Sequence, residues 1–423
     1  MIVELVVLSS ALVIGLRAAL MLLAGTAFLG AVVGLRSPRV GLLSIGMLCV
    51  MEPLLQSFML TGGLFRWNTL NYWLLAVTVV SLPFLLRRRG LPFRLLQALL
   101  LLLIFELFMS QDRARGLQDA LGMAAVLGLL AYFGRARLTR DDWLWCGIVC
   151  GMLSAAGGAV YFIQRESLPA INPNAWAGFP LAGLVALALA APFTAHRRGS
   201  STLVSLLATV TAAWIFLSGS RGNMLMAAAT VAYLLACLRG LSRRAVLVGL
   251  AGLVMMVAAA AFPALQARAF KRVSVLFDSS ATMRDKTSHR SELVLAGWYI
   301  AQDHPLGVGT GGFTKAWERL GRRPGLASVD AYRRMSAHAG WIKILAENGI
   351  PGALLLAAFV ASFAVTGWRQ RRRSALRVGL WASVTLGLAF ISTEYQTKAI
   401  WFLAAGAMVM LHRRGPLLRR RHG

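Results

Sequence analysis

Apolar runs long enough to cross a membrane recur along almost the whole chain, and short arginine clusters separate them in pairs. Of the 423 residues, 58% are hydrophobic, against roughly 45–50% in a soluble domain. The hydrophobic period is helical, and a bilayer offers no water to backbone groups that lack a hydrogen-bond partner. The sequence therefore predicts an all-α polytopic membrane protein, folded as a bundle of transmembrane helices.

The arginine clusters predict which connections face the cytoplasm, because cytoplasmic loops carry an excess of positive charge. They are Arg36/Arg39, Arg87–Arg89, Arg135/Arg137/Arg140, Arg197/Arg198, Arg239/Arg243/Arg244, Arg371–Arg373 and Arg419–Arg421. Between neighbouring clusters there is room for two spans, which gives about 12 spans with the C-terminus inside. These are expected at about 40–60, 68–86, 95–110, 117–134, 142–163, 174–193, 202–217, 223–238, 245–262, 351–368, 378–393 and 398–412. Residues 1–34 form either one tilted helix or a short hairpin, so the total is 12–14; no cleavable signal peptide is expected there.

This topology divides the chain into four parts: an N-terminal transmembrane bundle at 1–262, an extracytoplasmic loop with short helices at 263–350, C-terminal transmembrane helices at 351–412 and a basic cytoplasmic tail at 413–423. Between Pro263 and Gly340 the loop holds twelve Lys or Arg and six carboxylates, a balance of +6. Positive charge on the outer face runs against the usual bias and requires a cause.

Composition and the absence of certain motifs limit the functions that the sequence predicts. The net charge of +28 lies mainly in short connections between spans, so we expect no nucleic-acid partner. The four cysteines lie in apolar segments without a CxxC motif, and no DxD, HExxH or HxxxH motif occurs, so neither cysteine chemistry nor a bound metal is predicted. Because the outer face lacks ATP and nucleotide sugars, any reaction there needs an activated donor that is already bound to the membrane.

Arg221 lies in the turn Ser218-Gly219-Ser220-Arg221-Gly222 and is the only charge between Thr202 and Leu238. An arginine at membrane depth is costly unless it reaches the interface or meets an anion. It either snorkels to the interface or binds an anion together with the backbone N–H groups of the turn.

Arg290 is expected at the start of a helix that runs to Gln302. A guanidinium beside the free N–H groups of a helix N-terminus suits a phosphate, and the alternative is a surface ion pair with Glu292 or Asp285. Beyond it, Gly307-Val308-Gly309-Thr310-Gly311-Gly312 fits GxGxxG. With no preceding strand and no helix clearly following, we interpret it as a turn that folds closely against helix ends, and not as a dinucleotide site.

His338 is the candidate general base. Ser336 is expected to cap a short helix that Asn348 and Gly349 end, which places His338 in the first turn of that helix. A helix N-terminus favours the neutral imidazole, which can accept a proton. The alternatives are a hydrogen-bonded structural histidine and the other histidines of the loop, His289 and His304.

Three segments in this order resemble the O-antigen ligases, within the ligase/polymerase superfamily of bacterial surface polysaccharides. They are the Ser218–Gly222 turn, then a basic outer loop with Arg290, Trp298 and Pro305-Leu306-Gly307-Val308-Gly309, and then His338 followed by Glu347-Asn348-Gly349-Ile350-Pro351-Gly352. The likeness covers roughly Asn172 to Gly352. One departure is Ala339, where the family often has Asn after the histidine.

The resemblance implies a C-type glycosyltransferase of the bacterial inner membrane, with its active site facing the periplasm. It would transfer O-antigen from undecaprenyl diphosphate to a sugar of lipid A–core, in contact with membrane lipids and with no metal or other cofactor. By this likeness Arg221 and Arg290 hold the donor diphosphate, and His338 acts at the acceptor hydroxyl. Secondary substrate contacts are expected at Arg284, Lys286, Ser220, Asn174 and Glu347.

Three other functions remain open at this point. An O-antigen polymerase would use the same donor with a lipid-linked acceptor, and an O-oligosaccharyltransferase would modify protein. A polysaccharide-lipid flippase, from another class, would place its charges in a cavity within the membrane and not in an outer loop.

Overall fold

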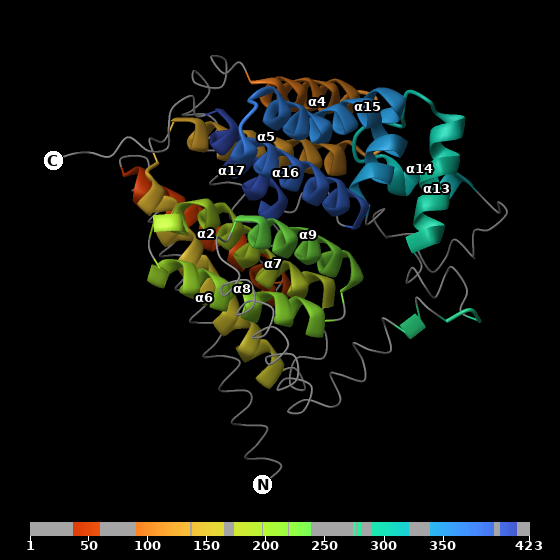
Figure 1. Cartoon of the computed structure of the whole chain (residues 1–423). Coiled ribbons are helices and arrows are strands. Elements are labelled where there is room, and N and C mark those ends of the chain that lie inside the picture. The colour runs from red at the N-terminus through yellow and green to blue at the C-terminus, as the bar shows by residue number, and fades with distance from the viewer. Residues whose placement is uncertain are drawn as a thin grey trace, which may run out of the picture. The chain divides into compact units, whose positions relative to one another are not determined.

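A computed structural model describes residues 37–59, 90–135, 138–164, 173–196, 198–218, 220–237, 274–275, 278–280, 290–320, 339–392 and 398–412. Helices are the only regular elements in these ranges (Figure 1), which confirms the all-α prediction for the described part of the chain. The predicted spans 68–86 and 245–262, the segment 1–34 and the tail 413–423 lie outside these ranges.

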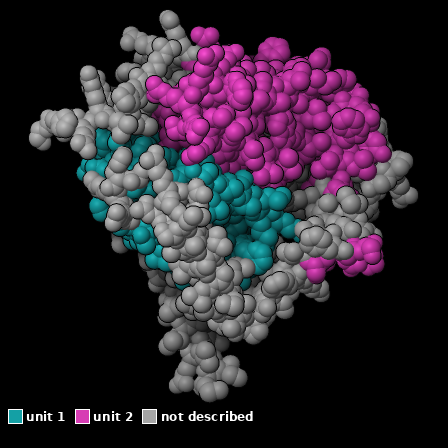
Figure 2. Space-filling view, viewed as in Figure 1, with its two compact units in different colours: residues 1–73, 136–269 teal, residues 74–135, 270–423 magenta. Residues whose placement is uncertain are grey.

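The helices belong to two compact units, coloured separately in Figure 2, and each unit combines two stretches of chain. Unit 1 comprises residues 1–73 and 136–269, and unit 2 comprises residues 74–135 and 270–423.

Unit 1 holds α2 (Pro38–Met59), α6 (Arg140–Gln164), α7 (Pro173–Ala190), the 3₁₀ helix η2 (Ala191–His196), α8 (Arg198–Leu217) and α9 (Arg221–Cys237). The start of α6 is a reciprocal cap: Thr139 N–H donates to Asp142 Oδ2 at 2.7 Å and Asp142 N–H donates to Thr139 Oγ1 at 3.3 Å. Asp142 also accepts a hydrogen bond from Arg39 Nε at 2.6 Å, which joins two helix starts that were both predicted to face the cytoplasm.

The centre of unit 1 is α7, which contacts α2, α6, α8 and α9. Small residues let α6 approach it closely: a Cβ on Gly183 would lie 2.0 Å from Ser154 Oγ, and one on Gly147 would lie 2.5 Å from Ala190 Cβ. Cys146 and Cys150 of α6 are buried free thiols with their Sγ atoms 4.0 Å apart, and Cys146 Sγ donates to Leu42 O of α2 at 3.7 Å.

Unit 2 holds α4 (Leu91–Leu107), α5 (Arg113–Arg135), α13 (Arg290–Asp303), α14 (Phe313–Leu320), α15 (Gly340–Arg369), α16 (Arg373–Ser392) and α17 (Lys398–His412). The long helix α15 lies against α4, α13 and α16 (Figure 1). In its second half, Phe359 lies edge-on to Phe363 and also contacts Trp401 of α17, which in turn contacts Phe390 of α16.

Four helices among the described residues are long and apolar enough to cross a membrane: Ala177–Thr194, Gly199–Leu217, Gly340–Arg369 and Arg373–Ser392. The helices α9 and α17 are apolar but shorter. The fold is thus consistent with a membrane protein, and the total of 12–14 spans stays a prediction.

Candidate functional site

The turn that carries Arg221 is built as predicted, between the end of α8 at Leu217 and the start of α9 at Arg221. Ser220 precedes the helix and is buried: its carbonyl accepts the N–H of Met224 at 2.9 Å, and its Oγ accepts a hydrogen bond from Asn223 Nδ2 at 2.9 Å. These bonds make Ser220 the N-terminal boundary of α9. The half-buried Arg221 therefore lies on the first turn of a helix, where the N–H groups favour an anion.

Arg290 is the first residue of α13, which confirms the predicted helix start. At the other end of α13, His304 N–H still bonds to Ile300 O at 2.8 Å before the chain turns away. For Arg290 the structure describes the backbone alone, so its contact with a phosphate stays a prediction.

The glycine-rich segment after α13, residues 307–312, is the tight turn that its sequence indicates, called the glycine turn below. Gly307, Gly309 and Gly311 have φ of 92°, 85° and 82°, values that side chains with a Cβ rarely adopt. A Cβ on Gly309 would lie 2.6 Å from the backbone of Ser110, and one on Gly311 would lie 2.4 Å from Gly116 N. These glycines are needed because backbone meets backbone, and not because a dinucleotide must fit.

One detail of the prediction for this segment is wrong. We expected no helix after the glycine turn, but α14 begins directly at Phe313, where Ala316 N–H bonds to Gly312 O at 3.0 Å. The element before the turn is a helix and not a strand, so the argument against a dinucleotide fold stands.

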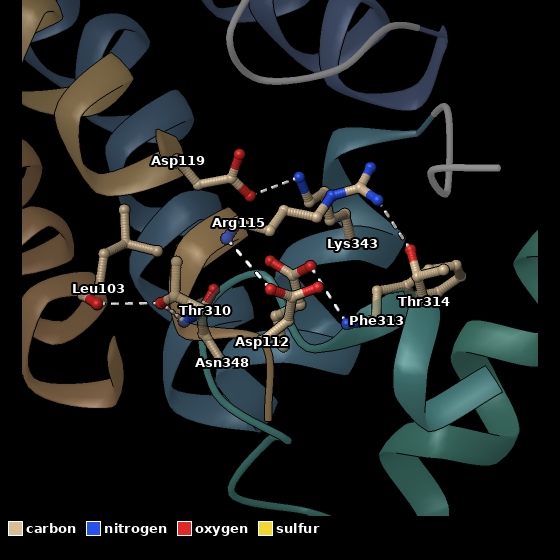
Figure 3. Close-up of polar contacts among 10 residues, drawn as sticks. Leu103, Asp112, Arg115, Asp119, Thr310, Phe313, Thr314, Lys343 and Asn348 are labelled. Carbon is tan, nitrogen blue, oxygen red and sulfur yellow. Dashed lines mark hydrogen bonds and ion pairs between the residues drawn. The ribbon is translucent and has the colours of Figure 1, made fainter. Parts of the chain in front are cut away.

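The glycine turn and α14 are fixed to the connection between α4 and α5. Arg115 Nη1 donates to Thr314 Oγ1 at 3.0 Å, and Lys315 Nζ donates to Gln111 O at 2.8 Å. Figure 3 shows Arg115 reaching toward Thr314 beside the turn. The connection between the predicted spans 95–110 and 117–134 lies opposite the cytoplasmic arginine clusters that flank them, which places it on the same outer face as the loop at 263–350. This docking fits that topology.

The start of α15 corrects a second prediction. The helix begins at Gly340 with Ala339 as its N-cap, in an extended conformation (φ −141°) and without a capping side chain. The expected cap, Ser336, therefore precedes the cap position by three residues, and His338 precedes the helix instead of lying in its first turn. The expectation rested on serine's preference for N-cap positions, but Ala339 supplies the extended backbone directly.

The predicted break at Gly349 is confirmed. Gly349 has φ 63° and ψ −163° inside α15, and a Cβ there would lie 2.3 Å from Pro305 O. The N–H of Ile350 donates to that same carbonyl at 2.9 Å. The chain just before the glycine turn thus inserts at the kink and divides α15 into a short first half and a membrane-length second half.

The first half of α15 (Gly340–Asn348) carries a buried polar cluster, drawn in Figure 3. Lys343 Nζ lies 2.7 Å from Asp119 Oδ2 of α5, and 3% and 6% of these side chains are exposed. Glu347 is fully buried and accepts the N–H of Phe313 through Oε1 at 3.4 Å. Its charge interacts with both Lys343 and Asp119.

Asn348 extends this cluster to α4 and the glycine turn. Its Nδ2 donates to Glu106 Oε2 at 2.5 Å and to Thr310 Oγ1 at 3.1 Å. Thr310 in turn donates to Leu103 O at 2.9 Å (Figure 3). Polar side chains from four segments therefore meet at the base of the glycine turn, and they hold the turn against α4, α5 and α15.

Of this cluster, only Glu347 was predicted as a site residue. Glu106 and Asp119 are each the only charged residue in a predicted span, 95–110 and 117–134. A lone carboxylate in a span is a strong signal of a buried polar site, and it could have directed attention here. The partner Lys343 comes from a segment more than 200 residues away, which no local pattern indicates.

The predicted site residues fall into three groups. Arg221 and Ser220 lie in unit 1, and Glu347 lies in unit 2. Arg290 and Asn174 are placed by their backbone alone, at the starts of α13 and α7. His338, Arg284 and Lys286 lie outside the described residues.

Residues 203–357 match the family model described as O-antigen ligase. No curated protein sequence matches the chain. The matched segment contains Arg221, Arg290 and His338, together with the glycine turn, the first half of α15 and the kink at Gly349.

Proposed function

Because residues 203–357 make this chain a member of the O-antigen ligase superfamily, we propose that it transfers O-antigen polysaccharide from undecaprenyl diphosphate to a sugar of lipid A–core. The observation that carries the proposal is the family match, which includes the three candidate residues Arg221, Arg290 and His338. Members of this superfamily are glycosyltransferase-like enzymes that act on lipid-linked polysaccharide.

In the proposed reaction, an oxygen of the acceptor sugar attacks the anomeric carbon of the donor. The new C–O bond forms as the bond from the anomeric carbon to the diphosphate oxygen breaks, and undecaprenyl diphosphate leaves with the electron pair. Attack from the face opposite the leaving group inverts the anomeric centre. The proton of the acceptor hydroxyl passes to neutral His338, which acts as the general base.

The two arginines stabilise the charge that develops on the leaving diphosphate. A guanidinium binds phosphate oxygens through two parallel hydrogen bonds and remains charged at every physiological pH. The position of Arg221 on the first turn of α9, and of Arg290 as the first residue of α13, supports this role, because helix N–H groups add to the positive potential. Two such groups allow the departure of a diphosphate without a metal.

The proposed location is the inner membrane, with the site facing the periplasm. An outer loop with a balance of +6 then has a cause, since the lipid-linked donor and phosphorylated lipid A–core are both anionic. The hydrogen bonds of α14 with Arg115 at the start of α5 and with Gln111 of the α4–α5 connection support the idea that the loop packs onto helix ends at that face.

Purified protein in detergent or liposomes, with lipid-linked O-antigen and lipid A–core, tests this function. We expect capped lipid A–core as the product, with formation unaffected by EDTA. The anomeric configuration of the new linkage, read by NMR, should be opposite to that of the donor. Retention of configuration, or activity that EDTA removes and added metal restores, would contradict the mechanism.

A further inference from the structure

The first half of α15 is held from two sides within unit 2. On one side, the Lys343 ammonium is paired with Asp119 of α5 at 2.7 Å in a buried setting. On the other side, a Cβ on Gly297 of α13 would lie only 2.4 Å from Cγ1 of Ile342, so the two helices approach at the distance that glycine permits. Consecutive residues, Ile342 and Lys343, thus fix this half-helix against α13 and α5 at once.

The same lysine is bonded to the residue that follows His338. Lys343 N–H donates to Ala339 O at 3.0 Å, in the first turn of α15. Ala339 forms no side-chain cap, so the start of the helix depends on backbone bonds and on the anchors that follow. Lys343 is the first charged anchor after His338, and it lies one helical turn beyond Ala339.

The charges around this anchor are one ammonium and two carboxylates, from Lys343, Asp119 and Glu347. Glu106 is engaged separately by Asn348. A buried ion pair is a weak source of stability, because a well-packed apolar pair of similar volume is often equally stable. What the ion pair adds is a directional contact. The short bond from Lys343 Nζ to Asp119 Oδ2 fixes the distance and the register between α5 and α15.

We propose that Asp119 and Lys343 are a positioning pair, which holds the start of α15 so that His338 is presented to the acceptor hydroxyl. This proposal rests on the proposed function, in which His338 is the base. Both side chains are buried and paired with each other, so the proposed role is indirect: Asp119 holds Lys343, whose N–H is bonded to Ala339 O. The pair affects catalysis because a base displaced by about 1 Å loses on the order of 100-fold in rate.

The test replaces both charges together, with Asp119→Asn/Lys343→Met. This double variant keeps similar side-chain sizes and leaves the local net charge unchanged, so Asp119 is not left as a buried carboxylate without its ammonium. Glu347 keeps its hydrogen bond from the N–H of Phe313. We expect a fold close to wild type by thermal unfolding, an unchanged KM for lipid-linked donor and a kcat lower by on the order of 10- to 100-fold. A purely structural role would leave kcat unchanged in the folded protein.

The matched control is Arg39→Met/Asp142→Asn, which removes a charged pair of unit 1 whose Nε and Oδ1 atoms lie 2.6 Å apart. We expect it to leave kcat and donor KM within twofold of wild type. Should the Asp119/Lys343 double variant fail to fold, Gly297→Ala provides a second route, because its Cβ must displace Ile342 and with it the start of α15. It should show the same loss of kcat at unchanged donor KM.

A readout that needs no turnover separates this proposal from the proposed function. Diethyl pyrocarbonate modification of His338, followed by mass spectrometry, should change in rate at least about threefold in the double variant, while the exposed His304 serves as the internal reference. If the wild-type protein does not transfer O-antigen to lipid A–core, the proposed function is wrong. The rate of His338 modification then still tests whether Asp119 and Lys343 position that residue. A folded double variant with wild-type kcat, or with an unchanged rate of His338 modification, overturns the positioning role.

Discussion

Two helical segments are buried to a similar depth but in opposite surroundings: α7 of unit 1 and the first half of α15 of unit 2. From Ala177 to Ala190 every residue of α7 is buried, and every one is apolar or small. The first half of α15 buries Lys343, Glu347 and Asn348, which bond to α5, α14, α4 and the glycine turn. We infer that α7 is a scaffold helix held by close apolar packing. The first half of α15 is instead held by hydrogen bonds and an ion pair, next to the chain segment that bears His338, the proposed base.

The largest expected effect is the loss of transfer in His338→Ala. Removal of a general base lowers the rate by about 10²- to 10⁴-fold, and because His338 precedes α15, the thermal unfolding temperature should stay near that of wild type. Initial rates of lipid A–core capping by purified protein measure this change. Normal capping by the variant would remove His338 from the mechanism and leave His289 and His304 as candidates.

Lys343→Met alone should destabilise the protein more than any single polar change in unit 1. It leaves Asp119 buried beside Glu347 without an ammonium, a change that typically costs about 3–5 kcal/mol. The unit 1 counterpart is Trp214→Phe, which removes the bond from Trp214 Nε1 to Ala155 O at 3.0 Å and should cost about 1 kcal/mol. Thermal or urea unfolding in detergent compares the two; equal losses would mean that the two interiors do not differ as described.

Glycine substitutions compare the two units at the level of the backbone, starting with the kink in α15. Gly349→Ala forces a Cβ into a left-handed position against Pro305 O and should cost about 1–3 kcal/mol, together with a loss of transfer. Gly199→Ala in α8 of unit 1 is the matched control, because nothing lies within 4 Å of its Cβ position. That change should be neutral or stabilise by up to about 1 kcal/mol. A Gly349→Ala protein as stable and active as wild type would show that the kink is not required.

The smallest effects are expected from Arg221→Ala and Arg290→Ala, each with at least about a tenfold loss of kcat/KM for the lipid-linked donor, or about 1.4 kcal/mol. Arg→Lys at either position should restore only part of the rate, because a lysine cannot form the two parallel bonds. Steady-state kinetics with the donor varied measure both. Near-normal constants in both alanine variants would exclude the diphosphate role and return Arg221 to a snorkelling residue at the interface.

The sequence was most informative where a signal is local. The helix from Arg290, the turn before Arg221 and the break at Gly349 were all predicted, because start residues, glycines and prolines determine backbone geometry within a few residues. The glycine turn was interpreted correctly as a close backbone approach, since GxGxxG without a preceding strand lacks the context of a dinucleotide site.

Prediction from the sequence failed where the N-cap position of a helix or a contact with a distant residue had to be identified. Ser336 was predicted as the cap because propensity favours serine, but α15 begins at Gly340 with Ala339 as its N-cap. The Asp119–Lys343 pair joins residues 224 positions apart, and no periodic pattern encodes such a contact. Lone carboxylates at Glu106 and Asp119 were the available signal, and they indicate buried polar contacts without identifying the partner.

The most direct test of the central claim is a competition between acceptors in one reaction. Purified wild-type protein receives labelled undecaprenyl diphosphate-linked O-antigen together with equal amounts of lipid A–core and of a second lipid-linked repeat unit. The account predicts that the label appears on lipid A–core, and that His338→Ala abolishes this product. Label found instead in longer lipid-linked chains would identify a polymerase and contradict the assignment of a ligase.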